Sequence, residues 1–232
     1  KNSEPTDHIT PLTRVRTAMK YLKSASKLLA HERKKWDEGF SFIAGIDEAG
    51  RGPLAGPVVA AAVIFSKKHR IPIVNDSKQL SEKQRLEMRE NIIAAKDVRF
   101  SVIEIGPEEI DFLNILRATH QAMKKAVLSL GIAEFALIDG LPVPDFPLPS
   151  EAIVKGDSKS ASIAAASILA KTRRDDIMME MDKLYPEYGF ASHKGYGTAD
   201  HLEALKKYGP SPIHRKSFAP VRDIINPPPE QL

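Results

Sequence analysis

The sequence predicts an α/β domain, because short apolar runs of strand length alternate with longer segments whose apolar residues recur at helical spacing. The predicted strands lie at 42–46, 57–65, 98–105 and 134–139, and the one at 98–105 alternates between apolar and polar residues. The first is followed directly by two carboxylates, and the last ends in one. Because strand-end carboxylates gather at one edge of an α/β sheet, where sites usually lie, the pattern predicts a functional site at that edge.

Length and composition fit a globular domain with an appendage. The chain has 232 residues, of which 42% are hydrophobic and 28% charged, and it has no cysteine, which excludes disulfides and thiolate metal sites. No segment approaches the ~20 apolar residues of a membrane span, and we find no apolar signal-peptide core, so we expect a cytoplasmic protein without membrane contact. We expect a basic helical extension at 1–39, a main domain at 40–225 with a C-terminal helical part, and a disordered tail at 226–232.

The extension is predicted to be helical. Thr10 and Pro11 match an N-cap and a first helical residue, and apolar residues then recur at helical spacing as far as Trp36, opposite a face rich in Lys and Arg. Residues 1–40 carry the whole formal net charge of +4, whereas residues 41–232 are neutral overall. Two interpretations stay open: the helix packs on the main domain, or it contacts a nucleic acid or a partner.

The most informative stretch follows the first apolar run, where Asp47 and Glu48 stand side by side. Neighbours on a strand point to opposite faces, so both carboxylates can serve one site only where the strand ends and the backbone bends. In the next turn, Gly50 and Gly52 let the backbone approach a ligand, and Arg51 supplies a fixed charge suited to phosphate. An acidic pair at a strand end is more often a solvated turn, but the Gly-Arg-Gly turn favours a site for metal and phosphate together.

The middle of the chain supplies predicted helices. Ser81 and Gln84 form a capping-box pattern that starts one of them. Residues 107–130 are predicted to form a short helical turn and then a longer helix capped by Asn114. These elements would cover the predicted sheet.

Two further carboxylates stand at element boundaries. Asp139 closes the run at 134–139 and precedes a glycine. After a Pro-rich loop and a brief edge strand at 152–154, Asp157 stands at the start of a long helix predicted at 158–184. A ligand role for Asp157 competes with an N-cap role, which is worth roughly 1 kcal/mol of helix stability.

The last section is the most basic part of the main domain. Residues 191–216 hold five Lys and Arg, two acids and three His, and a helix is predicted at 199–208. Gly195 and Gly197 frame Tyr196, and because a core tyrosine is rarely framed in this way, we expect an exposed ring. The neighbouring basic residues predicted to hold phosphates are His193, Lys194, His214, Arg215 and Lys216.

The residues that stand out for chemistry are four carboxylates: Asp47, Glu48, Asp139 and Asp157. Without Cys or a clustered His pair, zinc is disfavoured, and an all-carboxylate site favours Mg²⁺ or Mn²⁺. Four acids can hold two such ions about 3.5–4 Å apart, one activating water and the other stabilising the leaving oxygen of a phosphodiester. Like charges this close repel without metal, so the metal-free site should be strained or partly protonated. We therefore expect phosphodiester hydrolysis at a two-metal site.

Three segments of the chain closely resemble the ribonuclease HII family: GIDEAGRGPLAGPVVAAAVI, DSKQLSEK and GDSKSASIAAASILAK. The resemblance covers about residues 41–222. It implies an RNase H-like fold, with a mixed central sheet flanked by helices and an added C-terminal helical part. It also implies an endonuclease that hydrolyses RNA in RNA–DNA hybrids and incises 5′ to single ribonucleotides in duplex DNA, leaving 3′-hydroxyl and 5′-phosphate ends. We expect a monomer.

The resemblance also implies roles for individual residues. The implied metal ligands and catalytic residues are Asp47, Glu48, Asp139 and Asp157. The predicted substrate-binding residues are Gly50, Arg51, Gly52, Lys78, His193, Lys194 and Tyr196. In the family pattern the Gly-Arg-Gly turn contacts the backbone around the scissile phosphate and reads the 2′-hydroxyl, while the tyrosine packs on the deoxyribose that follows the ribonucleotide. By itself, Lys78 would be taken for a solvated loop lysine.

Three alternatives are weighed against this interpretation. Members of the related ribonuclease HIII family carry a sizeable N-terminal substrate-binding domain and lack the Gly-Arg-Gly form, whereas this chain has the turn and an extension of about 39 residues. A non-catalytic nucleic-acid-binding module would be indicated by the loss of one of the four acids, and all four are present. Another two-metal nuclease on the same fold is disfavoured by the Gly-Arg-Gly and Gly-Tyr-Gly segments.

Overall fold

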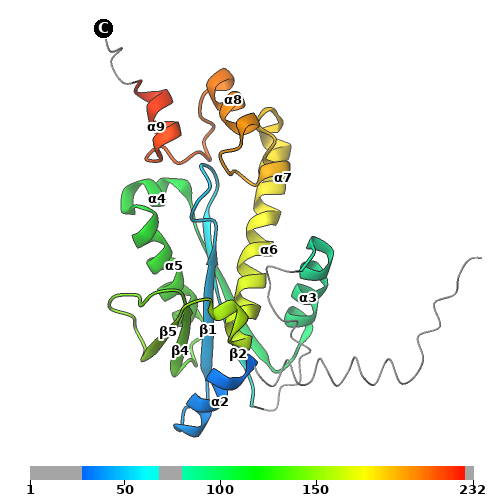
Figure 1. Ribbon diagram of the computed structural model, residues 1–232, viewed down its shortest axis with the longest axis vertical. Helices are drawn as coiled ribbons and strands as arrows, with labels where there is room; N and C mark the ends of the chain where they lie inside the picture. The colour runs from blue at the N-terminus through cyan, green and yellow to red at the C-terminus, as the bar shows by residue number, and fades with distance from the viewer. Residues whose placement is uncertain (1–27, 68–79, 228–232) are drawn as a thin grey trace, which may run out of the picture.

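The computed structural model describes residues 28–67 and 80–227, and its centre is a mixed five-stranded sheet in the order β3-β2-β1-β4-β5 (Figure 1). The strands are β1 (Ile43–Ala49), β2 (Val58–Phe65), β3 (Val98–Ile105), β4 (Phe135–Asp139) and β5 (Ser150–Ile153). Central strand β1 pairs antiparallel with β2 and parallel with β4. The sheet confirms the predicted α/β class, and it brings the C-terminal ends of β1 and β4 together.

Helices cover both faces of the sheet (Figure 1). α5 (Ile115–Ser129) packs on one face, and α6 (Ala161–Leu184) packs with α3 (Glu82–Ala94) on the other. The shorter helical elements are α2 (Ala30–Asp37), α4 (Pro107–Leu113), η2 (Gly156–Ser158), η3 (Pro186–Tyr188), α7 (Phe190–His193), α8 (Ala199–Tyr208) and α9 (Ala219–Ile225). None of the helices in the described ranges is long and apolar enough to cross a membrane.

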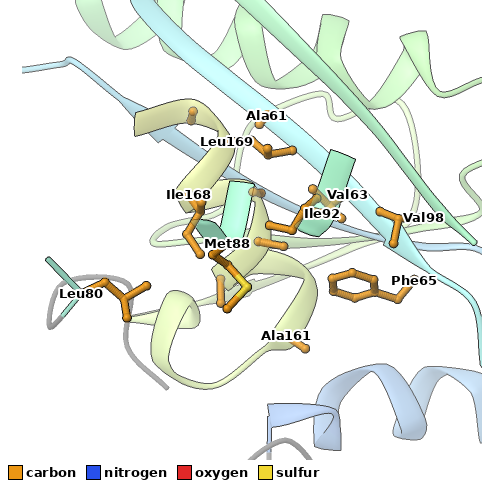
Figure 2. Packing of buried hydrophobic residues seen from close by; sticks show 14 of the residues in the cluster. Ala61, Val63, Phe65, Leu80, Met88, Ile92, Val98, Ala161, Ile168 and Leu169 are labelled. Carbon is orange, nitrogen blue, oxygen red and sulfur yellow. The ribbon is translucent and has the colours of Figure 1, made fainter. Parts of the chain in front are cut away.

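The apolar core lies in two layers because every residue of β2 is buried. Alternate residues of a strand enter opposite layers. Val63 and Phe65 pack with Met88 and Ile92 of α3 and with α6 (Figure 2), whereas Ile64 packs in the layer of α5. A continuous apolar run, in place of an alternating one, is what a strand covered on both faces requires.

Local capping explains where two of the predicted helices begin. Ser81 accepts a hydrogen bond from the Gln84 amide, and the Gln84 side chain accepts one from the Ser81 amide, which confirms the capping box of α3. Asn114 confirms its predicted role by accepting from the Arg117 amide at 3.1 Å at the start of α5. Each side chain satisfies a backbone donor that the helix itself leaves unpaired.

The N-terminal extension packs on the main domain in the part that the structure describes. Glu32 of α2 is 1% exposed, and its Oε1 accepts hydrogen bonds from the Ser162 amide at 2.9 Å and from the Ser160 and Ser162 hydroxyls at 2.6 and 2.7 Å. Glu32 therefore caps the start of α6 from a distant segment. The predicted helix start at Thr10 lies outside the described residues.

This contact makes Glu32 a predicted stability determinant. Glu32→Ala leaves the Ser162 amide without its charged acceptor, so we expect it to lower the free energy of unfolding by about 2 kcal/mol. Urea denaturation measures the loss. The matched control is Glu38→Ala, which removes an exposed partner of Lys35 and should change stability by no more than about 0.5 kcal/mol. Equal losses for both variants would contradict the capping role.

Candidate active site

The carboxylates that the sequence singled out lie around one cleft. β1 and β4 are parallel neighbours whose paired residues end one position before Asp47 and Asp139. Asp157 lies in η2, which follows β5, the other neighbour of β4. With Glu48 these side chains line an open cleft of about 510 Å³. The sequence suggested that the acidic pair comes after the strand. In the structure β1 continues to Ala49, so both acids are among its last residues.

Other elements complete the wall of the cleft. The further lining residues are Ala49, Gly50, Arg51, Gly52, Arg85, Ser167, Lys171, Arg174, Asp175 and Tyr196. The Gly-Arg-Gly turn and Tyr196 were expected there, whereas the residues from α3 and α6 were missed. A signal for α6 exists: Ser167, Lys171 and Asp175 recur every four residues, so they lie on one face of the helix.

Asp47 is the most perturbed acid of the site. It is 6% exposed, and its Oδ1 accepts a hydrogen bond from the Glu48 amide at 2.7 Å. Burial, together with the negative charges of Glu48 and Asp139, raises the pKa of Asp47 well above its ordinary value, although a hydrogen bond from Ser167 opposes the shift. Such surroundings favour the protonated form, and a cation that offsets the neighbouring charges would favour the ionised form.

Glu48 and Asp139 are turned toward partners other than Asp47. Burial raises the pKa of Glu48, the charge of Arg51 opposes that rise, and Arg51 Nη1 donates to Glu48 Oε1 at 3.3 Å. Asp139 Oδ1 accepts a hydrogen bond from the Gly156 amide at 2.5 Å. This contact joins the ends of β4 and η2, so it brings Asp139 toward the turn that carries Asp157.

The N-cap interpretation of Asp157 is wrong. α6 begins at Ala161, and its N-cap is Ser160, whose hydroxyl accepts a hydrogen bond from the Ile163 amide at 3.2 Å. Asp157 lies three residues earlier, in η2, and is 2% exposed on the wall of the cleft. Both Asp and Ser favour N-caps, and the sequence analysis considered only Asp157 for this role.

The chemistry of these four acids fits a hard divalent cation. Within residues 28–67 and 80–227, no group of three or more His, Asp or Glu side chains is already arranged to hold a metal ion. Glu48 and Asp139 hold Arg51 and the Gly156 amide instead. Their oxygens are nevertheless the ligands that Mg²⁺ and Mn²⁺ prefer. The pKa of Asp47 is raised first by burial and then by the charges of Glu48 and Asp139, and a cation would neutralise the negative charge.

The Gly-Arg-Gly turn is held by a buried arginine that the sequence analysis misjudged. Arg215 is 0% exposed and donates through Nε to the Gly56 carbonyl at 2.9 Å and through Nη1 to the Arg51 carbonyl at 3.0 Å. Its Nη2 donates to the Gly50 carbonyl. Burial lowers the pKa of Arg215 to about 9, which still leaves it charged at neutral pH. Arg215 therefore fixes the path of the turn from behind.

Arg174 of α6 supports the same loop. It is 3% exposed and donates to the carbonyls of Pro57 and Ala55 at 3.1 Å and of Lys194 at 2.9 Å. Gly50 has a φ of +94°, and a Cβ there would lie 2.1 Å from Arg174 Nε, so conformation and space both require glycine at this position. Arg174 thus joins the loop that follows the Gly-Arg-Gly turn to the segment before Tyr196.

Tyr196 is half exposed at the rim of the cleft, as the flanking glycines predicted. A Cβ on Gly52 would be 3.5 Å from its Cε1, and the Arg174 guanidinium lies 6.0 Å from the ring centre. The Leu54 amide donates to the Gly195 carbonyl at 2.8 Å. The ring therefore stands beside the Gly-Arg-Gly turn, although about 145 residues separate them in the sequence.

The predicted basic surface at 191–216 needs correction. His214 and Arg215 are 1% and 0% exposed, so they cannot hold phosphates at the surface. His193 uses both ring nitrogens, toward the Tyr188 carbonyl and the Gly195 amide, and the Lys194 ammonium donates to the Ala191 carbonyl. Neither His193 nor Lys194 lines the cleft. Lys78, another predicted substrate contact, lies outside the described residues.

Comparison with known proteins gives consistent results. The family model for ribonuclease HII matches residues 44–221. A ribonuclease HII from Chlamydia pneumoniae is 52% identical over 209 residues, which span 90% of this chain and 97% of the relative. The residues matched by the family model include the four carboxylates, the Gly-Arg-Gly turn and Tyr196.

Solved structures share the fold. The ribonuclease H2 from Pyrococcus horikoshii OT3 superposes with a TM-score of 0.68 at 29% identity, covering 79% of this chain and 96% of that one. Bst-RNase HIII in complex with Mn²⁺ has a TM-score of 0.61 at 20% identity, covering 81% of this chain and 70% of that one. The likeness to the second protein is one of fold alone.

Proposed function

The chain belongs to the ribonuclease HII family and is thus an endonuclease of the ribonuclease H type, and we propose that it incises 5′ to single ribonucleotides in duplex DNA as well as within RNA–DNA hybrids. The proposed reaction depends on Mg²⁺ or Mn²⁺ and leaves 3′-hydroxyl and 5′-phosphate ends. We also propose that the enzyme acts as a monomer.

The observation that carries the proposal is the composition of the cleft. Four carboxylates line it together with the Gly-Arg-Gly turn and the tyrosine ring. The acids suit a metal-assisted phosphodiester reaction, and the turn with the ring suits recognition of a nucleic-acid backbone. A non-catalytic binding module would have no need of a buried acid such as Asp47, whose charge is costly in the metal-free protein.

The acids of the cleft and the Gly-Arg-Gly turn have different proposed roles. Asp47, Glu48, Asp139 and Asp157 would hold the metal, which when bound supplies a nucleophilic water and stabilises the leaving oxygen. Arg51 is half exposed and offers its charge to a phosphate oxygen when Glu48 turns away. The peptide groups of the turn can approach the ribose closely, because neither flanking glycine carries a Cβ.

The experiment that tests the function compares three labelled duplexes of one sequence: all DNA, DNA with one ribonucleotide, and a continuous RNA–DNA hybrid. We expect incision of the second and third with Mg²⁺ or Mn²⁺, no incision of the first, and none of any duplex with chelator. Product migration should place the cut 5′ to the ribonucleotide, with a 3′-hydroxyl that a polymerase can extend. Cleavage of the all-DNA duplex at a similar rate would contradict the proposed specificity.

Tyr196→Ala should harm incision at a single ribonucleotide more than cleavage within a continuous hybrid. A ring on a sugar face contributes about 1–3 kcal/mol by analogy with stacking on bases, which is about a tenfold to hundredfold change if it acts only in the transition state. The next sugar of a continuous hybrid carries a 2′-hydroxyl, so the ring should help less there. The measurement is kcat/KM on both substrates. Equal losses on both would mean that Tyr196 does not recognise the RNA–DNA junction and that other residues do.

A further inference from the structure

Behind Tyr196 lies a buried cluster of polar side chains that the cleavage chemistry does not use. His201 of α8 is 0% exposed, His214 is 1% exposed and Ser211 is 6% exposed. The two imidazoles face each other, with 2.9 Å between their Nε2 atoms. His201 Nδ1 lies 2.8 Å from the Tyr196 carbonyl oxygen. The cluster therefore ends on the backbone of the residue whose ring stands at the cleft.

The direction of each hydrogen bond follows from one fixed donor. The Ser211 amide can only donate, and it lies 2.9 Å from His214 Nδ1, which must accept. Neutral His214 then carries its proton on Nε2 and donates to His201 Nε2. His201 must in turn carry its proton on Nδ1 and donate it to the Tyr196 carbonyl.

A second argument fixes the charge state of the pair. A proton added to His214 Nδ1 would face the Ser211 amide N–H, with the Ser211 hydroxyl oxygen at 2.8 Å as its acceptor. A proton added to His201 Nε2 would face the N–H of His214. Burial lowers the pKa of His214 to about 4, and it lowers the pKa of His201 as well. The other titratable groups around the pair are His193, whose ring stacks on His201 at 4.5 Å, and Tyr188, whose ring lies 5.0 Å from His214. Both imidazoles are therefore neutral at neutral pH.

We infer that His201 and His214 are positioning residues for the proposed substrate contact: a one-way hydrogen-bond relay from Ser211 through both imidazoles fixes the Tyr196 carbonyl and thereby the ring at the cleft. The consequence for cleavage rests on the role proposed for Tyr196, whereas the relay itself does not. The segment needs such support because Tyr196, Gly197 and Thr198 are exposed and Gly195 has a φ of +81°. An exposed backbone next to glycine would otherwise sample many conformations.

The first test reads the relay directly. Long-range ¹H–¹⁵N NMR spectra of the full chain at pH 7.5 distinguish the two imidazole tautomers. We expect the Nδ1–H form for His201 and the Nε2–H form for His214. The Nε2–H form at His201, or an imidazolium at either position, would overturn the inference.

The second test reads positioning through hydrogen exchange. His201→Leu removes the imidazole donor to the Tyr196 carbonyl and leaves that oxygen with the Thr198 amide alone, at 2.8 Å. His201→Asn places an amide nitrogen near the position of Nδ1 and keeps a side-chain donor. We expect exchange of the 195–198 amides to accelerate about tenfold in the leucine variant and to stay near the wild-type rate in the asparagine variant. The matched control is Tyr188→Phe, which removes the neighbouring hydrogen bond from the Tyr188 hydroxyl to the Gly209 carbonyl and leaves the relay intact. Unchanged exchange in His201→Leu, or equal acceleration in all three variants, would overturn the inference.

Cleavage assays then separate the relay from the role of the ring. His201→Leu should lower kcat/KM on the single-ribonucleotide duplex about tenfold, and His201→Asn should keep most of the wild-type kcat/KM. In a protein that already carries Tyr196→Ala, His201→Leu should lower kcat/KM little further, because the ring that it positions is gone. Full additivity of the two losses would overturn the positioning role. If Tyr196→Ala instead cleaves both substrates like the wild type, the role proposed for the ring fails, and the tautomer and exchange results still decide whether the relay holds the segment.

Discussion

Asp47→Asn is expected to abolish cleavage while leaving the protein folded. Asparagine keeps the shape of the side chain and one oxygen but loses the charge that a cation needs at the centre of the four-acid site. Because the proposed metal would supply both the nucleophile and leaving-group stabilisation, the loss should be about a thousandfold or more in kcat/KM. The control is Asp145→Asn in an exposed loop, where the same chemical change should leave activity unaltered. Asp47→Asn activity within tenfold of the wild type would refute the assignment.

The same substitution should also stabilise the metal-free protein. The pKa of Asp47 is raised in the folded state, so the folded protein binds more protons than the unfolded chain, and stability falls as pH rises above about 4. Asparagine removes this cost, so without metal at neutral pH we expect Asp47→Asn to melt at or above the wild-type temperature. Added Mg²⁺ should raise the melting temperature of the wild type more than that of the variant. A lower melting temperature for the metal-free variant would show that Asp47 stabilises the fold.

Arg215→Met is expected to cause the largest loss of stability. Methionine fills much of the same volume but leaves the carbonyls of Gly50, Arg51 and Gly56 without their donor. Each buried unpaired group costs about 1–3 kcal/mol, and removal of a buried charge offsets part of the sum, so we expect a loss of about 3 kcal/mol. Cleavage should fall about a hundredfold even where the variant is fully folded, because the Gly-Arg-Gly turn would shift relative to the acids.

Two further variants control this result. Arg215→Lys keeps the charge but lacks the planar fork, so it should recover only part of the stability. Arg222→Met changes an exposed arginine that pairs with Asp223, and it should alter stability by about 0.5 kcal/mol at most. Urea denaturation compares all three. An Arg215→Met protein as stable as Arg222→Met would mean that water satisfies the carbonyls of the turn.

Features with a local physical signature were predictable from the sequence. The continuous apolar run of β2 predicted a buried strand, and Ser81 and Asn114 predicted where the helices that they cap begin. The carboxylates at the ends of β1 and β4 followed from the same logic, since strand ends of a sheet converge. The glycines around Tyr196 correctly indicated exposure of its ring.

What the sequence did not reveal depends on contacts between distant segments. Arg215 follows His214 and precedes Lys216, so it reads as one charge of a basic surface, yet its hydrogen-bond partners lie about 160 residues earlier. No local pattern marks an arginine whose partners are backbone carbonyls. Likewise, Glu32 resembles any acid of a charged helix until α6 is placed against it.

The most direct test of the central claim is a calorimetric titration of the metal-free protein with Mn²⁺. The proposed cation site combines acids from β1, β4 and η2, although their side chains are not arranged for it before metal binds. We expect two ions to bind to the wild type and to Asp145→Asn, and binding to be lost in Asp47→Asn. Equal affinity and stoichiometry for the wild type and Asp47→Asn would contradict the proposed site.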